Sequence, residues 1–514
     1  MVAAQLADHQ AGIKRIRSVI LRAMLMLFNS LEFLFVFLPA TLLLFYGSAR
    51  LLPARVVRRA ILVVLSLLFY GFWRPIYLPL LGASILGNFC FFKLSRRYPQ
   101  HRTLIIGIGV ACNLLLLAWF KYADFFIGTL NLLPGSDFAA LHIVLPLAIS
   151  FYTFTQIAFL CDAARRTDFD YSLLDYAFFA TYFPHLIAGP VIHHEELLTQ
   201  IDNVDRPGAM AHNLRYGIAL LVLGLVKKVL IADNLATIAT PIFAAADAGE
   251  LVSTAKAWQG ALAYTFQLYF DFSGYCDMAI GLSWMFGIKL PINFSAPYRA
   301  TNIADFWRRW HITLSDFLRD YLYVPLGGSR QGRARRYVNL LATMVLGGLW
   351  HGAGWNFVMW GALHGSYLAV HHGVSDLAPS LAQRLRRLRL LNWALTFVAV
   401  VLAWVFFRAT SWGGATSMLQ AMLWPDLLPA GTAAEWLWIG AAGILAVAGC
   451  SALQIANGVE IALARRPEHL PPLPAWGRAP ALVLTNPVVA ALLFLACLWQ
   501  TITAGAGEFL YFNF

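Results

Sequence analysis

Apolar runs of about 20 residues, separated by short basic loops, extend through most of this 514-residue chain. A helix needs about that length of apolar sequence to cross a bilayer. Hydrophobic residues make up 60% of the chain and charged residues only 12%, a balance that a water-soluble globule cannot bury. The sequence therefore predicts an all-α polytopic membrane protein with about 11–13 transmembrane or re-entrant helices. The regular candidates are 31–48, 59–73, 77–94, 103–119, 141–162, 213–232, 257–287, 390–407, 435–455 and 484–503, and the less regular ones are 124–133, 174–192, 337–350 and 355–370.

The net charge of +12 comes from basic clusters in the loops between these segments. Basic loops mark the cytoplasmic side of an inner membrane, so the charge indicates topology and not a nucleic-acid partner. The loops 50–59, 96–102, 329–336 and 384–389 are predicted to be cytoplasmic, and the tail 507–514 periplasmic. Residues 1–25 form a basic extension, and 26–514 are predicted to fold as a single transmembrane domain.

His351 is the strongest candidate for a functional residue. The apolar stretch from Tyr337 to Trp350 has 14 residues, about 21 Å of helix, which is less than the roughly 30 Å of the bilayer core. Glycines surround His351, and another apolar stretch follows up to Val370. We therefore expect a helix that enters from the cytoplasm, breaks inside the membrane and returns. An imidazole there can act as a general base near neutral pH.

Two carboxylates, Asp271 and Asp277, lie within the apolar segment that also contains Tyr269, Ser273 and Tyr275. A charge at the bilayer centre costs about 2.5–3.5 kcal/mol, so each carboxylate needs a partner or a cavity. In a helix, Asp271 would face Tyr275 and Ser273 would face Asp277, four residues apart. Structural hydrogen bonds and the lining of a substrate tunnel are both open interpretations.

The loop 299–336 predicts an amphipathic interfacial helix. Asn302 supplies an N-cap, and aromatic and aliphatic residues follow at spacings of three or four. Pro325 and the two glycines after it would end the helix before a basic run. His311 lies in this stretch, where a histidine beside tryptophans is commonly a membrane anchor.

No histidine or cysteine pattern predicts a metal site. His193 and His194 precede two glutamates, but four adjacent residues cannot all face one ion, so a solvated loop is the simpler interpretation. His364 and His371 share one helical face, and no further ligands join them. We therefore expect no bound metal.

The sequence resembles the membrane-bound O-acyltransferase superfamily, and more narrowly its bacterial branch that acetylates alginate. The matching motifs are 26–33, 150–155, 183–190, 269–281, 306–315, 320–328 and 348–355, together with the aromatic C-terminal tail. By this resemblance, His351 corresponds to the catalytic histidine and His311 to the second histidine of the bacterial branch. The family fold is a ring of helices around a central tunnel, with the catalytic centre here at about 263–372.

The resemblance implies acetyl transfer from acetyl-CoA, with no bound cofactor. His351 would remove the proton from an acceptor hydroxyl, and Trp350, Asn293 and His311 are candidates for stabilising the oxyanion. Tyr269, Asp271, Ser273, Asp277 and Trp310 would support or line the tunnel, and Arg330, Arg333, Arg335 and Arg336 are candidates for holding donor phosphates. The partner would be a periplasmic SGNH-type acetyltransferase or another polysaccharide-modifying protein. The implied polymer is an exopolysaccharide, alginate first, with cellulose and peptidoglycan as alternatives.

Two other classes of function compete with acetyl transfer. A transporter or flippase could move an acetylated carrier, but such proteins place their sites between internal repeats, and no repeat is visible in this sequence. An inert scaffold for a periplasmic complex gives no reason for a histidine at a glycine-rich break.

Overall fold

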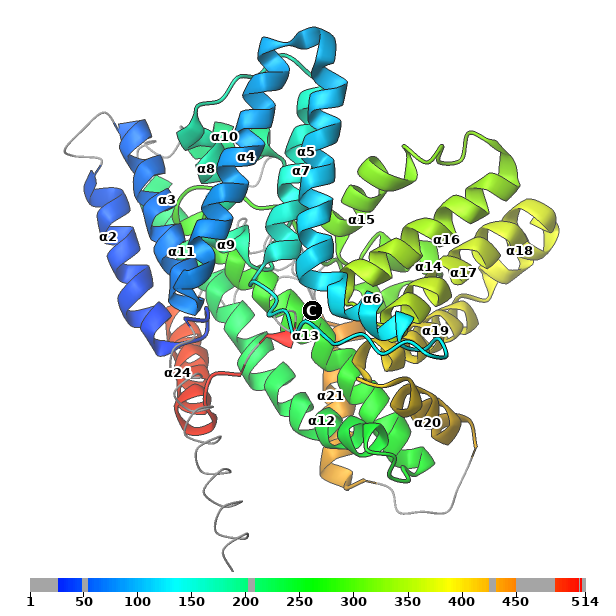
Figure 1. Ribbon diagram of the computed structural model, residues 1–514. Coiled ribbons are helices and arrows are strands. Elements are labelled where there is room, and N and C mark those ends of the chain that lie inside the picture. Colours follow the sequence, from blue (N-terminus) through cyan, green and yellow to red (C-terminus); the bar gives the residue numbers. More distant parts are fainter. Residues whose placement is uncertain are drawn as a thin grey trace, which may run out of the picture.

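The computed structural model describes residues 26–48, 54–201, 209–424, 431–449, 486–507 and 509–510 (Figure 1). Every regular element in these ranges is a helix, which confirms the all-α prediction. The basic extension 1–25, residues 50–53 of the loop 50–59, and residues 508 and 511–514 of the tail lie outside them.

Five helical stretches within the described ranges are long and apolar enough to cross a membrane. Their surfaces carry large exposed apolar side chains, as the lipid-facing side of a spanning helix requires. The protein is therefore a multi-pass membrane protein. The five stretches contain α3 (Ala54–Trp73), α4 (Leu78–Arg97), α5 with α6 (Arg102–Leu117 and Ala123–Leu130), α19 (Arg389–Arg408) and α24 (Pro487–Ala504).

Two predicted spans have different boundaries in the structure. Residues 141–148 are not helical, and α7 (Ile149–Arg165) begins only after them. The span 174–192 is broken into α8 (Leu173–Thr181) and the single turn α9 (Phe183–Leu186), where Pro184 occupies the first turn of α9. Further helices are α2 (Leu38–Ser48), α10 (His194–Gln200), α11 (Ala209–Leu225), α12 (Asp233–Asp247), α18 (Pro379–Arg387), α20 (Trp412–Leu423) and α21 (Ala433–Val447).

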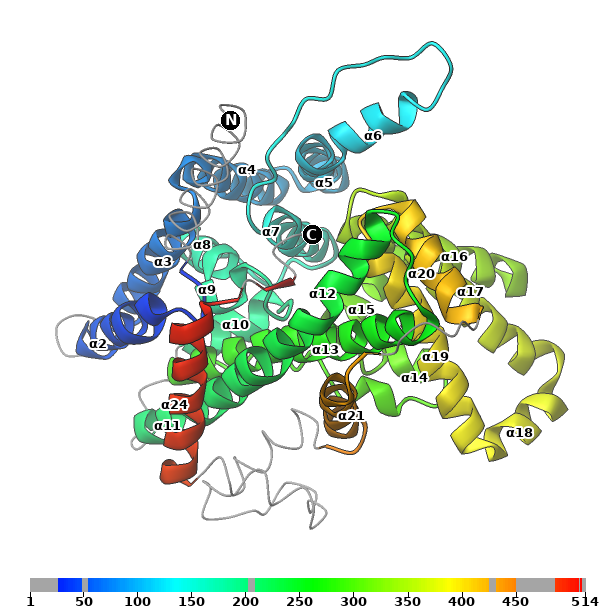
Figure 2. The same ribbon diagram turned by 90° about the horizontal axis from the view of Figure 1, so that it is seen from below.

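Helix α13 (Thr254–Met285) runs through the middle of the molecule, between the N-terminal helices and α16–α19 (Figure 2). It is buried along nearly its whole length, from Gln259 to Met285. Glycines let α11 approach it closely, because a side chain at Gly224 or Gly281 would collide with the backbone of the facing helix. Contacts between small residues of this kind allow helices to pack tightly within a membrane.

The helices α16 (Gly332–His351) and α17 (Trp355–Leu377) form the predicted hairpin, to the right in Figure 1. At its open end, Asp376 of α17 accepts from Arg336 at 2.6 Å and from Tyr337 at 2.9 Å. At its closed end, residues 352–354 turn the chain immediately after His351. The predicted break in the chain at this histidine is confirmed.

The predicted continuous interfacial helix in 299–336 is wrong. The chain forms α14 (Ile303–Trp307), α15 (Ile312–Leu318) and one π-helical turn, η8 (Arg319–Tyr323). The break falls at His311, whose φ of 45° no helix can accommodate. Asn302 does cap α14, accepting from the Asp305 amide at 2.8 Å. The apolar side chains of this segment pack into the protein core, while charged side chains such as Arg308 and Arg319 are exposed.

Candidate active site

His351 is the last residue of α16 and is only 3% exposed. Its ring lies among Trp350, Trp360 and Phe407, with centroid distances of 4.9, 5.1 and 5.2 Å. The ring of His311 is 6.4 Å away. Helix α16 thus ends with an imidazole inside an aromatic enclosure, facing a second imidazole.

The free carbonyls at the end of α16 are bonded by side chains from a distant segment. This segment is the π-helical turn η4 (Ala118–Tyr122), which joins α5 to α6. The Lys121 ammonium donates to the carbonyl oxygens of Trp350 and His351, the latter at 3.3 Å, and to the Ser150 hydroxyl at 3.1 Å. The Tyr122 hydroxyl donates to the Leu349 carbonyl at 2.9 Å.

A helix leaves its last four carbonyls without partners inside the helix. Here the Gly348 carbonyl accepts from the Gly352 amide, and η4 supplies donors to the other three. A lysine is well placed at a helix C-terminus, where the carbonyls carry partial negative charge. Sequence reasoning missed both η4 residues. A lysine inside the apolar stretch of α5 and α6 was the available signal, since such a charge needs partners.

His311 is completely buried and is held by Asn293. Its Nδ1 lies 3.1 Å from the Asn293 Oδ1, which also accepts from the amide and hydroxyl of Thr313. Because Thr313 donates to the same oxygen, we assign that atom as the amide carbonyl, which makes Nδ1 the protonated nitrogen of a neutral His311. The Asn293 amide nitrogen points instead to the Cys276 sulfur, at 3.4 Å.

The structure brings four of the predicted site residues together: His351, His311, Trp350 and Asn293. Trp350 packs on Phe151 and Phe154, with ring centroids 5.4 and 5.1 Å from its own. Its buried indole N–H has no hydrogen-bond acceptor within the described part of the chain.

Tyr269 and Trp310 lie one layer further out. Trp310 contacts Trp404, whose ring stacks on Trp360 of the His351 enclosure. Tyr269 reaches Trp310 with a centroid distance of 6.5 Å. Ser273 is buried in α13.

The two carboxylates of α13 pair with lysines, which corrects the partners expected within the helix. The π-helical turn η6 (Val226–Ala232) follows α11 and carries both lysines. Lys227 bonds Asp277 at 2.5 Å, and Lys228 bonds Asp271 at 2.7 Å. The signal for these partners in the sequence is the pair of adjacent lysines in the apolar run 213–232, since buried charges there need partners. These pairs favour the structural interpretation of the carboxylates.

The C-terminal tail reaches this cluster of charges. The Leu510 amide donates to Asp271 at 3.0 Å, and the Phe509 ring is buried under the Lys228 ammonium. The predicted periplasmic tail therefore returns into the protein at these two residues.

The four arginines predicted to hold donor phosphates differ in exposure and in pairing. Arg330, Arg333 and Arg335 are exposed, while Arg336 is held by Asp376 at 2.6 Å.

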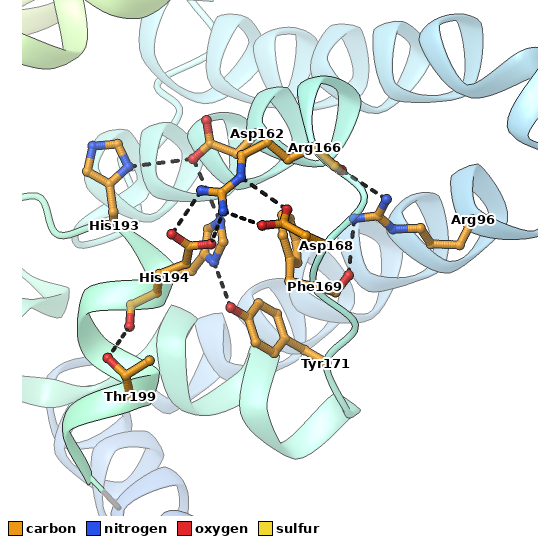
Figure 3. Close-up of polar contacts among 10 residues, drawn as sticks. Arg96, Asp162, Arg166, Asp168, Phe169, Tyr171, His193, His194 and Thr199 are labelled. Atoms are coloured by element: carbon orange, nitrogen blue, oxygen red, sulfur yellow. Dashed lines mark hydrogen bonds and ion pairs between the residues drawn. The ribbon is translucent and has the colours of Figure 1, made fainter. Parts of the chain in front are cut away.

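The pair His193 and His194 belongs to a polar network at the ends of α7 and α10 (Figure 3). Both rings approach Asp162, at 3.5 and 3.7 Å, and the His194 Nδ1 bonds the Tyr171 hydroxyl at 3.0 Å. Arg166 bridges Asp168 and Glu195. His194 is 2% exposed, so the solvated-loop interpretation is wrong for this residue. Within the described ranges, no three His, Cys, Asp or Glu side chains gather as a metal site would require.

A third imidazole, that of His364, is completely buried between Trp307 and Trp360. Neither of its ring nitrogens has a hydrogen-bond partner among the described residues. The sequence alone suggests His364 only as a partner of His371.

Comparisons with known proteins place these observations in a family. The model of the membrane-bound O-acyltransferase family matches residues 161–412. A peptidoglycan O-acetyltransferase of Helicobacter pylori is 43% identical over 432 residues, covering 79% of this chain and 81% of the relative. The Pseudomonas putida protein named "Probable alginate O-acetylase AlgI" is 43% identical over 411 residues, covering 77% and 80%. A teichoic acid D-alanyltransferase of Streptococcus thermophilus is 24% identical over 233 residues, covering 44% and 56%.

The identities and coverage of the first two relatives, together with the spanning helices, support an enzyme that transfers acetyl groups at a membrane. This chain is therefore a membrane O-acetyltransferase that belongs to the membrane-bound O-acyltransferase family.

Proposed function

We propose that the protein takes an acetyl group from acetyl-CoA on the cytoplasmic side and passes it across the membrane, with His351 as the general base. The observation that carries this proposal is the buried imidazole at the end of α16, whose terminal carbonyls are tied to Lys121 and Tyr122. General-base catalysis needs an imidazole held in one place, and this capping supplies it.

The reaction forms one ester and breaks one thioester. The acceptor hydroxyl loses its proton to His351 as its oxygen attacks the acetyl carbonyl. The carbon–sulfur bond then breaks, and coenzyme A leaves as the thiol after taking a proton back from His351. Such base assistance typically contributes about 10²–10⁴-fold in rate.

Among the three candidates for the oxyanion donor, the contacts favour Trp350. The Asn293 amide is directed at Cys276, and His311 directs its assigned N–H at Asn293. The Trp350 indole N–H is a buried donor beside His351 with no acceptor among the described residues. We propose that His311 accepts a proton or a hydrogen bond through its Nε2.

We also propose that Arg330, Arg333 and Arg335 attract the phosphates of the donor.

The acetyl group would then reach a polysaccharide outside the inner membrane through a periplasmic acetyltransferase of SGNH type. Alginate is the first polymer that we propose, on the identity to the AlgI relatives. Peptidoglycan is the second candidate polymer. It is retained because the H. pylori peptidoglycan O-acetyltransferase is also 43% identical to this chain.

The test uses purified protein in vesicles with radiolabelled acetyl-CoA, a periplasmic partner and each polymer. We expect thiol release and labelled product from the wild type, and a loss of about 10²-fold or more in His351→Ala. The matched control is His101→Ala, which removes an exposed imidazole. Equal release from the two histidine variants would remove His351 as the base, and the labelled polymer would identify the acceptor.

A further inference from the structure

A pocket of about 640 Å³ lies between α14, α17, α18 and α19, on the side of the molecule where α17 ends and α19 begins. This is also the side of the basic loops 329–336 and 384–389, which the sequence predicts to be cytoplasmic. The volume is within the range of small-molecule binding sites. No part of the proposed acetyl transfer uses this pocket.

The pocket lining contains Arg308, Arg389, His371 and His372, and no aspartate or glutamate. Among the described residues, the one carboxylate near the Arg308 guanidinium is that of Asp305, at 3.8 Å, and the Arg308 side chain is 72% exposed. Within the described residues, no ion pair involves Arg389. A lining with two arginines and no carboxylate attracts a phosphate.

The lining also contains exposed apolar side chains. They include Val370 of α17, which is 64% exposed, and Leu395 of α19, which is 60% exposed. Arg389 is the first residue of α19, which is one of the spanning helices, and Leu395 lies further along the same helix. The pocket therefore offers a cation at the end of a span and an exposed apolar surface deeper along that span.

We propose that this pocket binds the headgroup of an anionic phospholipid from the adjacent leaflet. Basic pockets between helices at this membrane face recognise phosphate headgroups in this way. The lipid phosphate would lie between Arg308 and Arg389, and its acyl chains would cover Val370 and Leu395. A phospholipid fits better than the acyl donor, because buried Trp307, His364 and Trp360 separate the pocket from His351.

Binding there would brace the helix that supports the site. Helix α17 contributes His371 to the pocket and, three helical turns earlier, Trp360 to the enclosure of His351. A headgroup bridging Arg308 of the α14 segment and Arg389 of α19 would hold both against α17.

The experiment is native mass spectrometry of the full-length protein, purified in detergent and titrated with phosphatidylglycerol or phosphatidylcholine. We expect the wild type to retain phosphatidylglycerol preferentially and Arg389→Gln to bind it about fivefold more weakly, the effect of one arginine near an anionic headgroup. Arg389→Lys should retain most of the binding. The matched control is Arg384→Gln, an equal loss of charge at an exposed position of α18 that does not line the pocket.

Three results would overturn the proposal. The first is equal retention of the two lipids by the wild type. The second is an equal loss of binding in Arg384→Gln and Arg389→Gln, which would indicate general attraction to basic loops. The third is stoichiometric displacement of phosphatidylglycerol by coenzyme A, which would assign the pocket to the donor. None of these lipid-binding measurements depends on acetyl transfer. The lipid proposal and the proposed function can therefore be tested independently.

Discussion

At the scale of single residues, the end of α16 that carries His351 depends on a lysine that is remote from it in sequence. Lys121 lies in a span and has no acidic partner among the described residues, and its ammonium is bonded by two carbonyls and a hydroxyl. Removing it would leave two helix-terminal carbonyls buried without donors, which commonly costs about 1–3 kcal/mol for each group. The end of α16 would then relax, and His351 with it.

We expect Lys121→Met to lower kcat for acetyl transfer on the order of 10²-fold with little change in KM for the donor, because a small displacement of a catalytic group has about that effect. Thiol release by the purified variant measures both constants. Lys93→Met, which removes an exposed lysine paired with Asp170, serves as the control. A Lys121→Met enzyme with normal kcat would show that the capping is dispensable.

The sequence could predict the residues of the site but not what holds them. The depth of His351 follows from counting residues to the end of an apolar segment, and Asn293 and His311 come from the resemblance. Lys121 and Tyr122 could not be assigned in the same way, because their hydrogen-bond partners lie 229 and 227 residues away. No local periodicity encodes such a contact.

At the scale of elements, the hairpin of α16 and α17 depends on glycines at its contact. A side chain at Gly348 would meet the Phe357 carbonyl oxygen, and one at Gly361 would meet the Met344 carbonyl oxygen. The two helix backbones are therefore nearly in contact on either side of the turn after His351.

We predict that Gly361→Ala destabilises the protein by about 1–3 kcal/mol, the usual cost of forcing atoms into a packed interface. The measurement is the apparent Tm of the purified protein in detergent. Gly373→Ala is the control on the same helix, where the nearest atom to an added methyl is the Tyr337 hydroxyl at 3.9 Å. If both variants melted at the wild-type temperature, the close approach of the helices would not limit stability.

The sequence predicts an element where its periodicity or apolar length determines that element. It does not predict an element whose boundary is determined by backbone strain. The long spans and the hairpin follow from hydropathy. The break between α14 and α15 does not, because the spacing of Phe306, Trp310 and Leu314 fits one continuous helix. The left-handed backbone of His311 interrupts it, and a histidine in that conformation has no reliable signature in sequence.

At the scale of the whole molecule, the polar network of Figure 3 joins α7 to the start of α10, and Asp162 of this network also bonds a residue of η8. Asp162 of α7 lies 3.5 Å from His193 at the start of α10 and accepts from Tyr321 of η8 at 2.8 Å. The hydrogen bond with Asp162 raises the pKa of His193 above its ordinary value, and Glu196 and Asp320 add to the rise. Burial instead lowers the pKa of His194 to about 4.

These two shifts act on stability in opposite directions. Because the pKa of His193 is raised in the folded state, its contribution to the free energy of unfolding is complete at pH values below the unfolded pKa of about 6.5. This contribution is lost as the pH rises through the pKa of His193 in the folded state. The contribution of His194 is present above about 6.5 and is lost as the pH falls toward 4.

We therefore predict that His193→Asn lowers the apparent Tm at pH 6 and that this deficit shrinks progressively above the raised pKa of His193. The measurement is a series of melting curves of the wild type and the variant across that range. His101→Asn, which changes an exposed histidine, should melt like the wild type throughout. A constant difference between the His193 variant and the wild type at every pH would contradict the assignment.

The capping of α16 by η4 also sets an order of events during synthesis. The ribosome adds Lys121 and Tyr122 long before it adds Leu349. The residues of η4 are therefore synthesised before the α16 carbonyls to which they bond. Until α16 arrives, the lysine is an uncompensated charge within a span, which the insertion machinery and early helix neighbours must tolerate. The end of α16 can be capped only after the first and second halves of the chain have met, so a chain truncated before residue 349 would lack the capped helix end that carries His351.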